Sequence, residues 1–512
     1  MDHTDNKRLV KNTIFLYIRM LLIIFVSLFT SRVTLQILGV DDFGIQQTVG
    51  GVVTFLAFIS NALGSGTSRF ITYELGKEEP QLDRLFSTVR LAHIVLGVLV
   101  VIVGEIVGLW FLNNKLIIPP ERMKAATIAF HFSILTTFFQ ITQVPYNAVI
   151  IAYEKMDVFA YVSIAEAVLK LVIVYCLLLT GFDKLIVYSI LLCLVTIIIM
   201  YIYRLYCRLR IKEVRTKLVF DKIMFKSVAI FSGWHILTSS AMSFANQGGT
   251  IVTNMFFSPA VVTVRSLGLR INGILNQFIG SFRTAMNPQI VKRYAAHEFE
   301  ESKKLALSST KYTYYLTFLI VLPLFLLIEP VLTLWLGNVP EGTVLFTKFA
   351  LIQALFQAFD TSLYVPIYAK GQIKENAIIS PLFDFIQLPA VYILFKLGFP
   401  PIALSCVELF ACISLGIIIK PILVHKIVDY KLGEVYRLLL NCFIVSVFSC
   451  ILPVCLYLLI DEKTIWGFII IGFVCVISVL SVVWFFGLDK ESKIVIKNWI
   501  SNKTHKKEKL ND

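Results

Sequence analysis

Charged residues are scarce in this sequence, at 16% of 512 residues, whereas a soluble domain usually carries about a quarter. Hydrophobic residues make up 57% and recur in helix-length runs along the whole chain, for example at 95–112, 186–200 and 465–486. Too few polar groups remain to cover a soluble protein of this size. The composition therefore excludes an ordinary soluble globular protein and indicates lipid as the surrounding solvent.

Motifs of soluble enzymes are also missing. The sequence contains no HExxH, no GxSxG and no glycine-rich phosphate loop with a following lysine. The nine cysteines show no CxxC spacing and fall mostly inside apolar runs, which is typical of reduced packing residues. The histidines are isolated and show no zinc spacing. We therefore expect no catalytic residues, no metal and no cofactor, and a protein that is not an enzyme.

The apolar runs predict membrane-spanning helices, because a helix satisfies its own backbone N–H and C=O groups where no water is present. Short alternating segments typical of a membrane barrel are absent. We expect an all-α polytopic membrane protein with about fourteen transmembrane helices. The first apolar run, 13–38, is too long for a cleaved signal and is interpreted as a retained span. The predicted spans are 12–38, 43–73, 84–112, 123–151, 156–180, 185–206, 226–257, 259–290, 305–336, 343–369, 376–396, 401–425, 435–460 and 465–486.

The net charge of +14 could suggest nucleic-acid binding, but the basic residues lie between and after the spans. Clusters at 204–212, 292–293, 303–304 and 503–509 are typical of loops held in the cytoplasm next to anionic lipid. No folded basic domain is available to read a groove, so nucleic acid is excluded as a partner and membrane lipids are expected. The charge asymmetry predicts that both termini are cytoplasmic, which requires an even number of spans.

A repeat is visible at a constant offset of about 221 residues, which aligns six spans with the next six and places Pro145 on Pro366. Because six is even, the halves are parallel repeats. We predict two parallel six-helix lobes plus two C-terminal helices. The corresponding domains are a 1–206 N-terminal lobe, a 207–225 cytoplasmic linker, a 226–425 C-terminal lobe, helices 13 and 14 at 426–486, and a basic cytoplasmic tail at 487–512.

Polar residues inside the spans are costly in lipid and tend to face a cavity or a partner. Small polar residues can instead join helices without any further function. An arginine away from the helix ends needs water or an anion, so Arg32, Arg265 and Arg270 are the principal candidates for a cavity role. Arg19, Arg69 and Arg283 lie nearer the cytoplasmic ends and could simply extend to the interface. The predicted polar lining of the cavity consists of Gln47, Thr54, Asn61, Ser65, His235, Asn246, Asn272 and Asn276.

Five carboxylates also lie within spans. Glu166 and Lys170 are spaced i,i+4, which favours a structural ion pair. The others are candidates for relaying protons or binding a coupling cation, namely Glu105, Asp360, Asp384 and Glu408.

The segments 12–19 (NTIFLYIR), 38–44 (LGVDDFG) and 61–70 (NALGSGTSRF) resemble those of bacterial Wzx-type polysaccharide flippases. That group belongs to a superfamily that also includes multidrug MATE exporters and the lipid II flippase MurJ. The resemblance covers the whole chain as architecture. It implies two lobes around a central cavity that opens alternately to the two sides of the bacterial inner (cytoplasmic) membrane.

The resemblance further implies a substrate, an undecaprenyl-pyrophosphate-linked oligosaccharide used for O-antigen or capsular polysaccharide of the cell surface, including lipopolysaccharide. Other polysaccharide assembly proteins would then be partners. The arginines agree with such a substrate, because planar guanidinium groups match phosphate oxygens. Two alternatives remain: a MATE-type small-molecule or drug exporter, which would need acidic cavity residues for cationic drugs, and a membrane-embedded polymerase or ligase, which would need a large outer loop.

Overall fold

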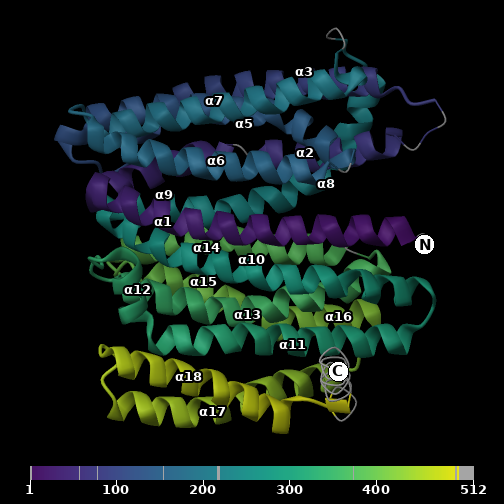
Figure 1. Ribbon diagram of the computed structural model, residues 1–512, viewed down its shortest axis with the longest axis vertical. Helices are drawn as coiled ribbons and strands as arrows, with labels where there is room; N and C mark the ends of the chain where they lie inside the picture. The colour runs from purple at the N-terminus through teal and green to yellow at the C-terminus, as the bar shows by residue number, and fades with distance from the viewer. Residues whose placement is uncertain are drawn as a thin grey trace, which may run out of the picture. The chain divides into compact units, whose positions relative to one another are not determined.

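The computed structural model describes residues 3–489, 493 and 494, apart from residues 57, 76, 78, 154, 216–218 and 373. The side chains of residues 3–19, 54, 56, 58–62, 65, 231–239, 242, 246, 281, 284 and 285 lie outside the described set. The described residues form helices and connecting turns, with no strand among them (Figure 1). Most described residues of each predicted span are helical; exceptions include Leu327, which separates α11 from α12, and the end residues Thr180, Phe257 and Ile460.

Contacts divide the chain into two compact units. Unit 1 comprises residues 1–266 and 377–407, and unit 2 comprises residues 267–376 and 408–512. The lobes predicted from the repeat stay a prediction. Residues 259–295 and 374–396 each form one helix that contributes to both units.

The helices of the first half are bounded as follows: α1 His3–Leu56, α2 Phe58–Leu75, α3 Leu82–Val103, α4 Leu109–Asn114, α5 Met123–Ala152, α6 Met156–Cys176, α7 Lys184–Arg210, α8 Lys222–Ser243 and α9 Gly249–Phe256. Two π-helical turns, Gly104–Gly108 and Phe244–Gly248, join α3 to α4 and α8 to α9. Within unit 1, α5 packs against both α3 and α7 (Figure 1).

The second half contains α10 Pro259–Ala295, α11 Phe299–Leu326, α12 Ile328–Leu336, α13 Thr343–Lys370, α14 Lys374–Lys396, α15 Ala403–Ile413, α16 Lys420–Val428, α17 Leu432–Leu459 and α18 Ile465–Val482. The π-helical turn Ser414–Ile419 joins α15 to α16, and another, Val483–Gly487, follows α18. Within unit 2, α11 packs against α13, α17 and α18. Pro145 and Pro366 lie inside α5 and α13, at nearly the same distance from the start of each helix.

Two different turns open the second span of each half. In α1, Gly39 has a φ of 79° and a ψ of 173°, which interrupts the helix without ending it. A positive φ favours glycine because the residue has no Cβ. In the second half, extended Phe257 ends α9, and Pro259 begins α10, where the missing N–H of proline costs nothing.

Nine helices in the described part of the chain are long and apolar enough to cross a membrane, and α11 with α12, bent by 79°, would make ten. The helices α10 and α13 are not among them, because several polar or charged residues interrupt each apolar sequence. The α17 residues Leu440, Phe443 and Phe448 are more than half exposed, as expected of side chains in contact with lipid. The prediction of an all-α polytopic membrane protein is confirmed.

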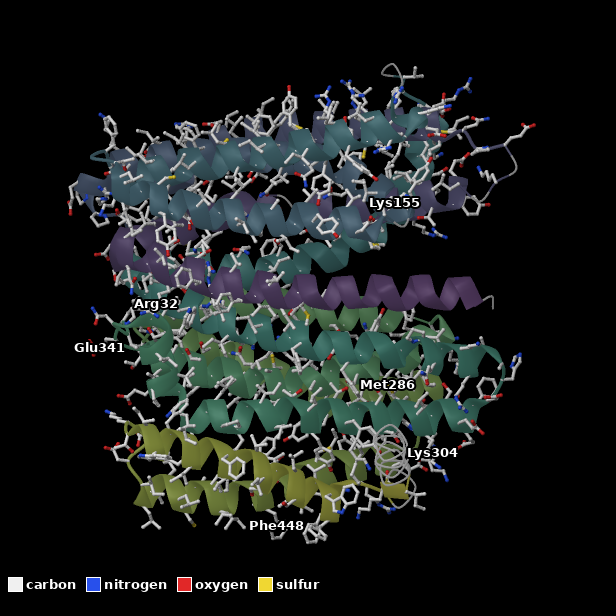
Figure 2. All side chains as sticks on the ribbon, viewed as in Figure 1. Arg32, Lys155, Met286, Lys304, Glu341 and Phe448 are labelled. Atoms are coloured by element: carbon white, nitrogen blue, oxygen red, sulfur yellow. The ribbon has the colours of Figure 1, made fainter. Side chains whose placement is uncertain are left out.

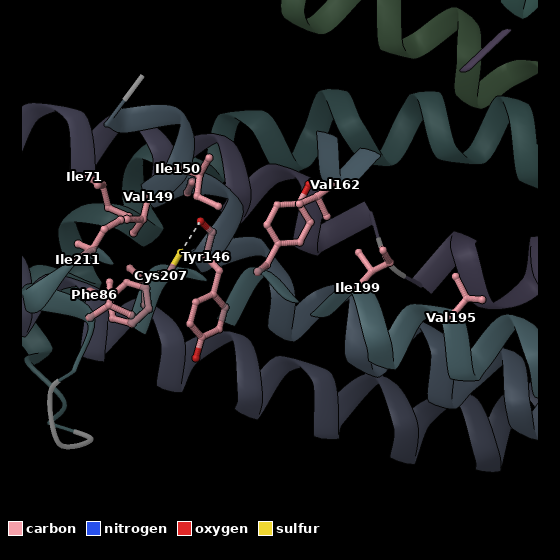
Figure 3. Packing of buried hydrophobic residues seen from close by; sticks show 14 of the residues in the cluster. Ile71, Phe86, Tyr146, Val149, Ile150, Val162, Val195, Ile199, Cys207 and Ile211 are labelled. Carbon is pink, nitrogen blue, oxygen red and sulfur yellow. Dashed lines mark hydrogen bonds between the residues drawn. The ribbon is translucent and has the colours of Figure 1, made fainter. Parts of the chain in front are cut away.

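The largest core of unit 1 joins α3, α5, α6 and α7. Figure 3 shows Phe86, Tyr146 and Ile199 within it, together with the Cys207 thiol, which donates to the Tyr146 carbonyl at 3.7 Å. The predicted ion pair between Glu166 and Lys170 is present on α6 at 2.6 Å.

Candidate functional site

The arginines predicted to line a cavity occupy different environments. Arg265 is 2% exposed inside unit 1, where its Nη1 donates to the Thr250 hydroxyl of α9 at 3.0 Å. Gly249 lets the guanidinium approach, because a Cβ there would lie 2.8 Å from Arg265 Nη2. The Arg265 guanidinium on α10 therefore packs closely against α9.

Arg32, labelled on α1 in Figure 2, is half-buried in unit 1. Arg69 on α2 is exposed, and its guanidinium lies 5.8 Å from the centre of the neighbouring Phe70 ring. Arg270 and Arg283 on α10 are half-buried and belong to unit 2. These side chains keep accessible surface, which a group that meets an anion requires.

The predicted lining residues of α10 bind α13 within unit 2. Asn272 Nδ2 donates to the Ala350 carbonyl at 2.7 Å, and Asn276 Nδ2 donates to Gln357 Oε1 at 2.9 Å and to Asn272 Oδ1. These contacts join the two helices through a polar seam. In unit 1, Gln47 donates to its neighbour Gln46 at 3.0 Å.

Six of the predicted site residues have side chains outside the described residues: Arg19, Thr54, Asn61, Ser65, His235 and Asn246.

The four carboxylates predicted for ion coupling each have a polar neighbour. Glu105, in the π-helical turn after α3, contacts the His131 ring at 2.9 Å, and both side chains are partly exposed. Glu408 accepts from Gln353 at 3.4 Å, and Asp384 accepts from Gln387 at 3.3 Å. No groups of three or more metal-binding side chains occur among the residues that the structure describes.

Asp360, the fourth carboxylate, has a partner that the sequence did not reveal. It lies 3.1 Å from the ammonium of Lys420 on α16, a lysine that is 3% exposed. Lys420 also donates to Asn376 Oδ1. The sequence did place Lys420 inside a predicted span, which is unusual for a lysine. Its partners Asp360 and Asn376 are 60 and 44 residues away, and no sequence spacing connects the three residues.

A second cluster that sequence reasoning missed joins three helices of unit 1. Arg122 donates to both oxygens of Asp42 and to both oxygens of Asp183, at distances between 2.5 and 3.1 Å. Asp183 also caps α7, accepting from the backbone N–H of Leu185 and Ile186. Burial opposes ionisation of Asp183, but the hydrogen bonds from Arg122 and the backbone outweigh it and lower the pKa of this carboxyl.

Two concavities lie within unit 2. A groove of about 430 Å³ between α11, α12 and α18 is lined by apolar residues, including Leu324, Phe468 and Phe473. A cavity of about 540 Å³ lies at the ends of α10 and α13, beside Asn287, Lys292 and Tyr364. The first surface is wholly apolar and suits a hydrocarbon chain; the second is also mainly apolar, although its lining includes Asn287 and Lys292.

No family model matches the chain, and no curated relative matches its sequence. Solved structures do match its fold. The lipid II flippase MurJ in an inward closed conformation is 15% identical, with a TM-score of 0.69 over 96% of this chain and 100% of that one. A multidrug resistance MATE transporter of the MOP superfamily is similar in an inward-facing conformation, at 14% identity and a TM-score of 0.67 over 80% of this chain and 96% of that one.

An outward-facing MATE transporter matches at 14% identity and a TM-score of 0.59, over 83% of this chain and 96% of that one. Identities this low show the fold alone. The chain therefore has the fold shared by MurJ and the MATE transporters of the MOP superfamily.

Proposed function

We propose that this chain carries an undecaprenyl-pyrophosphate-linked oligosaccharide from the inner to the outer leaflet of the bacterial cytoplasmic membrane, for O-antigen or capsular polysaccharide biosynthesis. The observation that carries the proposal is the charge of α10. Its 37 residues contain no Asp or Glu, and three arginines lie within the predicted span: Arg265, Arg270 and Arg283. A basic helix of this kind matches a cargo with an anionic headgroup.

The fold supports a lipid-linked cargo and alternating access. One structure with this fold is a lipid II flippase, and MATE structures with it have been solved facing inward and outward. We propose that the chain alternates in the same way, with both termini in the cytoplasm. The apolar groove between α11, α12 and α18 supports a long hydrocarbon tail that stays in lipid while the headgroup crosses. Other proteins of polysaccharide assembly would supply and receive this cargo.

The arginines have separate tasks in this proposal. Arg32 and Arg69 of unit 1 and Arg270 and Arg283 of unit 2 keep accessible surface, and each is a candidate to bind the pyrophosphate directly. Arg265 is almost fully buried. Its positive charge would attract the pyrophosphate without direct contact, and its hydrogen bond to Thr250 would fix the shape of the α9–α10 junction. Glu105, Asp384 and Glu408 remain candidates for coupling transport to an ion from solution, whereas Asp360 already pairs with Lys420.

The test is restoration of surface polysaccharide in a strain that lacks its own flippase. We expect Arg32→Ala, Arg265→Ala and Arg270→Ala to reduce surface polysaccharide strongly at equal protein level. The Arg→Lys variants should retain part of it, because they keep the charge and lose the two-pronged hydrogen bonding. Arg293→Ala is the matched control on α10, because Arg293 is occupied by Glu298 and Glu301 near the helix end. Wild-type polysaccharide from all three Ala variants would refute the proposal.

The MATE likeness makes a small-molecule exporter the second candidate. An exporter of cationic drugs would need carboxylates where α10 has arginines. The same strain distinguishes the two functions: increased resistance to toxic cations without recovery of polysaccharide would favour the exporter.

A further inference from the structure

Lys420 places a buried ammonium beside oxygen atoms of Asp360 and Asn376, which belong to unit 2 like Lys420 itself. It begins α16, directly after the π-helical turn Ser414–Ile419. Its Nζ lies 3.1 Å from Asp360 Oδ1 of α13 and donates to Asn376 Oδ1 at the start of α14. The ring of Tyr364 lies below it, with 5.3 Å between Nζ and the ring centre.

This environment has the chemistry of a monovalent-cation site. A carboxylate oxygen, an amide oxygen and an aromatic face are all groups that attract a small hard cation. Asp360 Oδ1 is buried and makes no hydrogen bond to any described residue, so its attraction to Lys420 is electrostatic. Sodium, potassium and an ammonium group can all balance such an oxygen.

The packing around the site explains why the cation must be present. Gly416 brings the turn before α16 against α13, and a Cβ at Gly416 would lie 2.7 Å from the Phe356 carbonyl. This close approach leaves Asp360 only 25% exposed and Lys420 3% exposed. A buried charge without a partner strongly destabilises a fold. Arg283 of α10 lies within electrostatic range of Asp360, but the ammonium is the group in direct contact.

We infer that Lys420 is the resident cation of a monovalent-cation site formed by Asp360 and Asn376, so that the chain itself supplies the ion this site holds. Asp360 is then a ligand for an internal ammonium instead of an ion from solution. The inference does not depend on what the protein transports, because it concerns only how the buried charge of Asp360 in unit 2 is neutralised.

Shortening Lys420 to alanine tests the inference, because it leaves the oxygens in place and opens room for a hydrated ion. The measurement is thermal unfolding of the full-length protein in detergent, in sodium or potassium chloride against choline chloride at equal ionic strength. Wild type should unfold at the same midpoint in all three salts. Lys420→Ala should unfold earlier in choline and recover by about 2 °C or more in sodium or potassium. Adding Asp360→Asn should abolish the recovery.

Lys311→Ala is the matched control. Lys311 is also buried, at 6% exposure, and pairs with Asp489 at 2.7 Å, but that carboxylate is 62% exposed and is solvated without an ion. A salt response in Lys420→Ala no larger than that of Lys311→Ala overturns the inference, and so does a response in wild type. If Lys420→Ala is recovered folded only in sodium or potassium, the inference is supported; if it is recovered in no salt, the inference fails.

Discussion

Arg122 holds both carboxylate oxygens of Asp42, with Nε donating to Oδ1 at 2.7 Å and Nη2 donating to Oδ2 at 2.5 Å. The remaining nitrogen, Nη1, donates to Asp183 at 2.5 Å. One guanidinium therefore joins the turn in α1, the start of α5 and the cap of α7. A planar group with five donors suits this arrangement better than the single ammonium of lysine.

Replacing Arg122 by alanine should lower the stability of the protein by about 2 kcal/mol, because two carboxylates would face each other without a counter-charge. The midpoint of thermal unfolding in detergent measures the effect. Lys463→Ala is the control, since Lys463 and Glu329 form an exposed pair at 3.0 Å. Exposed pairs contribute little, so that midpoint should hardly move. Equal shifts in the two variants would contradict the structural role of Arg122.

Asp183 makes this stability dependent on pH. Its folded-state pKa is lowered below the ordinary value, despite burial, by Arg122 and the α7 backbone. The stabilisation is therefore fully present above the unfolded pKa of about 3.9 and is lost as pH falls through the folded pKa. Wild type should unfold at a higher temperature than Asp183→Asn at neutral pH, with a difference that shrinks below about pH 4. If the difference in unfolding temperature stays constant to pH 3 or widens in acid, the predicted direction of the pH dependence is wrong.

Gly249 offers a way to displace Arg265 while keeping its charge. A methyl group at this position would lie 2.8 Å from Arg265 Nη2 and would push the guanidinium away from Thr250. If Arg265 orders the α9–α10 junction for transport, Gly249→Ala should reduce surface polysaccharide by roughly tenfold, the equivalent of one charge-assisted hydrogen bond. Gly273→Ala on α10 is the control, because a methyl group there would have no described atom within 4 Å. Equal complementation by the two variants would argue against this role.

Topology is tested by labelling single cysteines from outside intact cells. The background must lack the native cysteines, since Cys406 and Cys455 are exposed. A cysteine at the exposed Arg215 should react only after the membrane is opened, because the basic linker is predicted to be cytoplasmic. A cysteine at Lys463 should react in intact cells. Outside labelling at 215 would reject the predicted orientation.

The helices could be predicted because a twenty-residue apolar run has few alternatives in lipid. The predicted span 185–206 lies within α7, Lys184–Arg210, and Asp183 directly before it forms the cap. The π-helical turn at Gly104–Gly108 could not be predicted, because it depends on packing: a Cβ at Gly108 would lie 2.4 Å from the Phe130 ring.

The candidate site was less accessible to sequence reasoning. Arg32, Arg265 and Asp360 were identified as unusual because they are charged and lie within predicted spans. Position within a span does not indicate which residue each side chain contacts. In the sequence, Arg122 has the features of an ordinary loop charge. Its partner Asp42 is 80 residues away, and only the fold brings the two side chains together. The polar seam from Asn272 and Asn276 to α13 likewise depends on which face of α10 meets its neighbour.

The turns at Gly39 and at Phe257–Pro259 have a consequence for the predicted repeat. One turn uses a left-handed glycine and the other an extended residue followed by proline, at positions about 221 residues apart. If the halves are the parallel repeats that this offset predicts, the two turns are separate backbone solutions to one geometric requirement. A residue-by-residue comparison of the halves would then find no match at such points, and a comparison of helix order would be the better test of a common origin.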